Sequence, residues 1–159
     1  MGALPNPHPL IVHFAIALFI AGAVIDLLGL RPGRDDWRPI GRANLLLGTA
    51  AAIFAALSGW YAGNTVEHVA QAHELMENHE TLGWVITGLA VVIAAWRVAR
   101  PALGRVWYAV AVIVVVGMLL LQGYWGGELV FRYGVGVSGQ QTSGEEHPHG
   151  VHEHHAGSH

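Results

Sequence analysis

The sequence predicts an all-α membrane protein, an antiparallel bundle of four transmembrane helices. Of the 159 residues, 53% are hydrophobic and only 12% are charged, whereas about a quarter of a soluble domain is charged. The apolar residues also gather in four blocks, each near the roughly 17–25 residues that span a bilayer as a helix. Short connections between an even number of spans favour an up-down-up-down order. The four blocks are residues 10–30, 43–62, 82–98 and 106–125.

The first block is predicted to be a retained helix rather than a cleaved signal peptide. Residues 1–9 contain no Lys or Arg, and the block is longer than the h-region of about 7–15 residues in a signal peptide. Pro32 and Gly33 end this helix, and Pro101 with Gly104 makes the turn between the third and fourth spans.

The arginines predict how the spans are oriented. The chain has no lysine, and seven of its eight arginines lie in the segments 31–42 and 97–105, leaving Arg132 on the other side. Such a bias in short loops marks the cytoplasmic side. We therefore expect a multi-pass protein of a bacterial inner membrane, with both termini and the 64–80 segment in the periplasm.

The 64–80 segment is predicted to form a short helix on the membrane surface between the second and third spans. Apolar and polar residues separate onto different faces at helical spacing. On this helix, His68 and His73 are expected to be surface residues. One face carries Val66, Val69, Ala70, His73 and Met76.

The chain divides into a four-helix membrane domain, residues 1–137, and a histidine-rich tail, residues 138–159. The tail has few apolar residues to fold around, so we expect a flexible periplasmic segment. Its histidines and glutamates have the composition of a Cu or Zn binder. The candidate ligands are His147, His149, His152, His154 and His155.

Histidines at the periplasmic end of the spans are the strongest candidates for chemistry. His13 lies about one turn inside the first span, and His79 begins the third span at the same depth. Because first and third helices stand diagonally across such a bundle, a haem iron could take one imidazole from each. His8 could substitute for either ligand, and Glu128 could accept a hydrogen bond that sets a histidine tautomer. The absence of cysteine excludes iron–sulfur ligation and covalent haem attachment.

Asp26 lies in the first span towards its cytoplasmic end. A charged side chain costs about 2.5–3.5 kcal/mol at the centre of a membrane helix and less near the interface. We expect Asp26 to pair with Arg31 or Arg42 or to reach water, and a role in a proton path is the alternative.

The chain carries four motifs that bear on its family: HPLIVHF at 8–14, DLL at 26–28, Asn78-His79, and GGELVFRYGVGV at 126–137. These motifs resemble the DUF2231 family of predicted bacterial membrane proteins. They cover nearly residues 7–137, and the tail lies outside the family pattern, as does Ala15, where many members have proline. Some members are fused to Rieske-type domains, so the resemblance implies respiratory electron transfer and draws attention to His8, His13, Asp26, His79 and Glu128.

The sequence thus favours a redox subunit that binds b-type haem near the periplasmic face. It would contact the lipid bilayer and other membrane or periplasmic redox subunits, and nothing points to nucleic acid. Two alternatives are a Cu or Zn relay that uses the tail and a structural subunit of a larger assembly. No nucleophile, phosphate loop or paired catalytic carboxylates are recognisable, so an independent enzyme is not expected.

Overall fold

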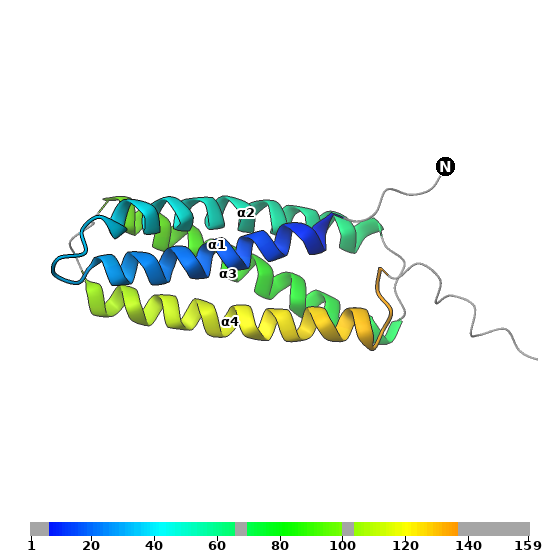
Figure 1. The fold of residues 1–159 in the computed structure, drawn as a ribbon. Helices are drawn as coiled ribbons and strands as arrows, with labels where there is room; N and C mark the ends of the chain where they lie inside the picture. Colours follow the sequence, from blue (N-terminus) through cyan, green and yellow to red (C-terminus); the bar gives the residue numbers. More distant parts are fainter. Residues whose placement is uncertain (1–6, 66–69, 100–103, 137–159) are drawn as a thin grey trace, which may run out of the picture.

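Four long helices form an antiparallel bundle (Figure 1). The computed structural model describes residues 7–65, 70–99 and 104–136. Each of the four long helices is long and apolar enough to cross a membrane, so the prediction of an all-α, four-span membrane protein is confirmed. The elements are α1 (His8–Gly29), α2 (Trp37–Thr65), the 3-10 helix η1 (Ala70–Ala72), α3 (His73–Ala99) and α4 (Arg105–Phe131).

A short helix lies between the second and third spans, as predicted, but it covers fewer residues than expected. Among the described residues it is η1, and α3 begins directly after it at His73, so residues 73–80 belong to the third long helix. The polar first turns of α3 are helical because Glu74 suits the positive end of the helix dipole. His73 and Glu77, one turn apart, also form a 3.3 Å ion pair when the imidazole is protonated.

Helices α1 and α2 pack backbone against backbone. A Cβ atom added to Gly22 would overlap the backbone of Leu45, and one added to Gly48 would overlap that of Phe19. Small residues let membrane helices approach this closely. They recur every seven positions, so they stay along the line of contact between α1 and α2, which we call the glycine seam. These buried small residues are Ala15, Gly22 and Gly29 on α1 and Gly41, Gly48 and Ala55 on α2.

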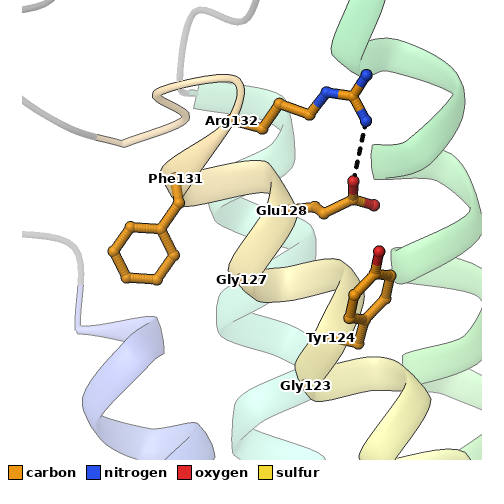
Figure 2. Close-up of a pocket in the computed structure, with 6 residues that line it drawn as sticks. All are labelled: Gly123, Tyr124, Gly127, Glu128, Phe131 and Arg132. Carbon is orange, nitrogen blue, oxygen red and sulfur yellow. Dashed lines mark hydrogen bonds and ion pairs between the residues drawn. The ribbon is translucent and has the colours of Figure 1, made fainter.

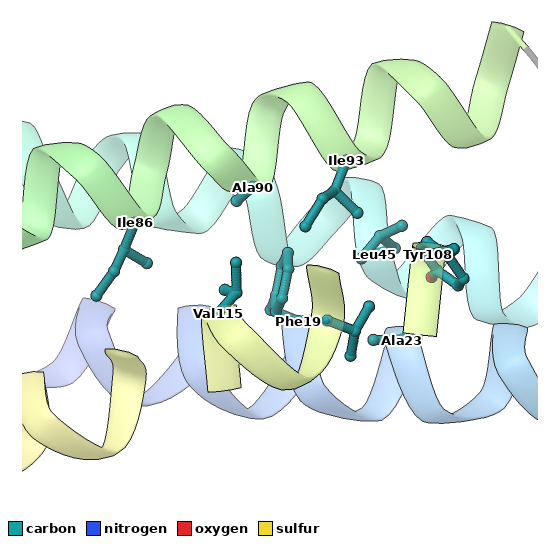
Figure 3. Packing of buried hydrophobic residues seen from close by; sticks show 9 residues of the cluster. Phe19, Ala23, Leu45, Ile86, Ala90, Ile93, Tyr108 and Val115 are labelled. Carbon is teal, nitrogen blue, oxygen red and sulfur yellow. The ribbon is translucent and has the colours of Figure 1, made fainter. Parts of the chain in front are cut away.

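An apolar core fills the middle of the bundle, between its two polar ends. All four helices contribute to it, and Phe19 of α1 points towards α3 with Val115 of α4 beside it (Figure 3). Neighbouring helices enclose the core in the order α1, α2, α3, α4, so that α1 and α3 stand on a diagonal. The core residues are Phe19, Ala23, Leu45, Ile86, Ala90, Ile93, Tyr108, Val112 and Val115.

Candidate functional site

His8 and His79 lie together at one end of the bundle, which we call the histidine end. His8 begins α1 and His79 lies in the second turn of α3, and the two imidazoles are within electrostatic reach of each other. Each ring rests on a glycine of the neighbouring helix. A Cβ on Gly59 would lie 2.8 Å from Cε1 of His8, and one on Gly126 would lie 3.2 Å from Cε1 of His79. Two glycines therefore make the space that the two rings occupy.

Ser58 of α2 orients the His8 ring. Nδ1 of His8 lies 3.0 Å from the Ser58 hydroxyl oxygen, and that hydroxyl donates to the Ala55 carbonyl at 3.0 Å. The hydroxyl has a single hydrogen, so both contacts are hydrogen bonds only if His8 Nδ1–H donates to the Ser58 oxygen. The hydrogen bonds thus assign the ring proton to Nδ1 and the lone pair to Nε2.

Gln122 of α4 holds His79 in the complementary way. Its amide nitrogen donates to the His79 carbonyl at 2.9 Å and lies 3.1 Å from Nε2 of the same residue. An amide nitrogen only donates, so Nε2 accepts and the ring proton is on Nδ1. Among the described residues, this buried Nδ1 has no hydrogen-bond partner. Sequence reasoning missed Ser58 and Gln122, although a polar residue inside an apolar block is itself a signal.

His13 does not face the bundle core, so the prediction that it lies there with His79 is wrong. Its side chain is exposed, and Nδ1 hydrogen-bonds the Pro9 carbonyl. The reason is geometric: five residues of helix turn the side-chain direction by about 140°. With His8 packed inward against Gly59, His13 points away from the interior.

Glu128 lies at the histidine end but is paired with an arginine. Its carboxylate accepts a hydrogen bond from Arg132 at 3.0 Å, and this bond raises the pKa of the exposed Arg132 guanidinium. In place of Glu128, Gln122 is the residue that contacts the His79 ring. Glu128 instead lines an open groove on α4 (Figure 2), together with Gly123, Tyr124, Gly127, Phe131 and Arg132.

The remaining histidine candidates do not join this site. His73 is exposed and lies beside Glu77, whereas His68 and all the tail histidines are outside the described residues. Within residues 7–65, 70–99 and 104–136, no three His, Asp or Glu side chains are grouped to hold a metal ion. The Cu or Zn site predicted on the tail therefore stays a prediction.

A buried ion pair occupies the opposite end, which we call the arginine end. Asp26 is 0% exposed and accepts two hydrogen bonds from Arg97 of α3, from Nε at 2.6 Å and from Nη2 at 3.0 Å. The Arg97 guanidinium lies 4.7 Å from the ring centroid of Tyr108 on α4, and the Asp26 backbone packs against Gly41 of α2. These four residues connect all four helices, and we call them the latch.

The prediction that Asp26 pairs with Arg31 or Arg42, or reaches water, is wrong: its partner is Arg97, and the side chain is buried. The sequence places Arg97 in the loop segment 97–105 beside the Pro101 turn, but α3 continues to Ala99. Position 97 continues a buried stripe at helical spacing, which places its side chain inside the bundle. The stripe consists of Ile86, Ala90, Ile93 and Arg97.

These features define the class of the protein: a multi-pass membrane four-helix bundle with polar clusters at both ends of an apolar core. Within that class, the chain belongs to the family described as predicted membrane protein (DUF2231), whose model matches residues 5–139. No curated protein and no solved structure matches the chain.

Proposed function

We propose that the protein is a membrane redox subunit that passes electrons within a respiratory-type complex and binds b-type haem at the histidine end. The observation that carries this proposal is that His8 and His79, from the diagonal helices α1 and α3, lie at the same end of the bundle within electrostatic reach of each other. Haem sites in helix bundles use side chains on facing helices in this way. The proposed ligand set thus replaces His13, which is exposed, with His8.

The hydrogen bonding of His8 supports this proposal. Ser58 accepts from Nδ1–H of His8, and a hydrogen bond of this kind typically orients a histidine ligand and sets its tautomer. The glycines under both rings make room for the imidazoles themselves, since an added Cβ would come within 2.8 Å of His8 Cε1 at Gly59 and within 3.2 Å of His79 Cε1 at Gly126. When bound, haem supplies one-electron chemistry, and the chain's own residues set its potential through ligand identity and burial.

The arginine distribution supports a periplasmic position for the histidine end. Arg97 is buried in the latch, so it leaves the group of seven loop arginines and six remain against Arg132. Six to one is still a strong bias towards the cytoplasmic side for the arginine end. We therefore propose a bacterial inner-membrane protein with periplasmic termini and with a membrane or periplasmic redox subunit as partner.

The optical spectrum tests the proposal. Purified full-length protein, loaded with haem if necessary, is expected to show a reduced-minus-oxidised α-band, and His8→Ala is expected to abolish it. His13→Ala is the matched control, because it removes an imidazole from the same helix but from the exposed face. A reconstituted protein without the band contradicts haem binding. Metal analysis before and after deletion of residues 144–159 then examines the alternative of a Cu or Zn relay.

A further inference from the structure

We propose that two copies of the chain associate through the outer face of α4, at the open groove near the end of that helix. The groove, which we call the α4 groove, is mostly apolar and also contains an ion pair (Figure 2). Its occupant is the same groove of a second copy, related by a two-fold axis along the membrane normal. This association does not depend on the proposed cofactor. The lining residues are Gly123, Tyr124, Gly127, Glu128, Phe131 and Arg132.

Helix α4 leaves its outer face uncovered in the single chain. Of the four long helices, α4 buries the smallest share of its apolar stretch. Phe131 is 91% exposed and Tyr124 is 63% exposed. A Cβ atom added to Gly123 or Gly127 would meet no atom of the described residues within 4 Å. The α4 groove is therefore open to a helix from outside the chain.

The shape of the α4 groove is complementary to itself. The side chains of Phe131 and Tyr124 project on opposite sides of α4, and the backbone between them is bare at Gly123 and Gly127 (Figure 2). Glycines four positions apart let two membrane helices approach closely. In a two-fold interface the same patch supplies both the projecting and the recessed parts. Two α4 helices that cross at these glycines would thus place the aromatic rings of each copy against the bare backbone of the other.

The ion pair in the α4 groove adds charge complementarity. Glu128 accepts a hydrogen bond from Nη1 of Arg132 at 3.0 Å, and the Arg132 side chain is 68% exposed. A guanidinium has five N–H donors, so Arg132 can bind a second carboxylate as well. Across a parallel helix pair, residues one turn apart face each other, and Glu128 of each copy would reach Arg132 of the other. Such charges select the partner and its register, whereas a lipid acyl chain offers no counter-charge.

Cross-linking tests whether the two grooves meet. The chain has no cysteine, so a single introduced thiol reports one position. Full-length Tyr124→Cys in membranes, treated with a short bifunctional thiol reagent, is expected to give cross-linked dimers. Tyr61→Cys is the matched control, because Tyr61 is 66% exposed and lies near the same end of the bundle, but on α2. Equal yields in both variants, no dimer in Tyr124→Cys, or links only to a different protein would overturn the proposal.

Filling the α4 groove should weaken the association. Gly127→Leu adds a side chain where the single chain has open space, so we expect a folded protein whose dimer dissociation constant rises about tenfold or more. Energy transfer between labelled copies, measured in lipid vesicles over a range of lipid dilutions, gives this constant. Gly88→Leu on α3 is the control, since an added Cβ there also meets no described atom within 4 Å. Wild-type association in Gly127→Leu would contradict the proposal.

Charge variants separate contacts between copies from the contact within one chain. Glu128→Arg makes the groove basic and Arg132→Glu makes it acidic, so each variant alone is expected to associate weakly. A mixture of the two is expected to form mixed dimers, because basic and acidic grooves then face each other. The ion pair within the chain is absent from both variants, so recovery on mixing must come from contact between copies. A mixture that stays monomeric would overturn the proposal, and so would a wild-type protein that is monomeric at every lipid dilution.

Discussion

Removing Arg97 alone should destabilise the bundle strongly. Asp26 is 0% exposed and Arg97 is 2% exposed, so Arg97→Leu leaves a carboxylate buried without its counter-charge. Breaking a buried pair from one side costs about 3–5 kcal/mol, whereas replacing both partners by apolar residues is often neutral or stabilising. We therefore expect a large loss for Arg97→Leu and for Asp26→Leu, and near wild-type stability for the double variant.

The assay is reversible unfolding in mixed micelles, with the four proteins forming a double-mutant cycle. The expected coupling is several kcal/mol, because each single variant already removes the interaction. Arg105→Leu is the control, since it removes an exposed arginine from the same end and should change stability by about 0.5 kcal/mol or less. If the two single losses simply add in the double variant, Asp26 and Arg97 do not stabilise the bundle as an ion pair.

Two further predictions concern packing. Gly48→Leu should separate α1 from α2, because any side chain at this position would overlap the Phe19 backbone; the loss should exceed about 3 kcal/mol. Gly88→Leu is its control, because no neighbouring atom among the described residues lies within 4 Å of an added Cβ. Equal losses of unfolding free energy in both variants would show that close packing at the glycine seam does not stabilise the bundle. Tyr108→Phe removes a buried hydroxyl that interacts with the Asp26–Arg97 pair but keeps the ring 4.7 Å from the Arg97 guanidinium. Its unfolding free energy should fall by about 0.5–1.5 kcal/mol, as for one hydrogen bond, whereas Tyr108→Leu should lower it further; an unchanged value in Tyr108→Phe would show that the hydroxyl has no partner.

The number and order of the spans followed from the sequence because apolar length is a local property. A helix satisfies its own backbone hydrogen bonds, and about 20 apolar residues suffice to cross a bilayer. The exact limits of α3 did not follow, since its polar beginning at His73 and its end at Ala99 extend beyond the apolar block. Turn residues such as Pro101 marked the connection well.

The candidate site was predicted only in part. The depth of His8 and His79 follows from their positions at the beginnings of two spans running in the same direction, and helix geometry shows that His8 and His13 cannot both face inward. Which of the two does so depends on the rotation of α1 about its axis. That rotation is set by the glycine seam with α2, where Gly22 meets Leu45.

By itself, the sequence determined the class of the protein: its spans, the grouping of its arginines at one end and the presence of histidines at the other. Only the tertiary structure decided which side chains meet. It paired Asp26 with Arg97, a residue 71 positions away, and placed His79 against Gln122, 43 positions away. The physical reason is that bilayer insertion depends on local composition, whereas contacts between helices depend on the rotation and close approach that packing alone establishes.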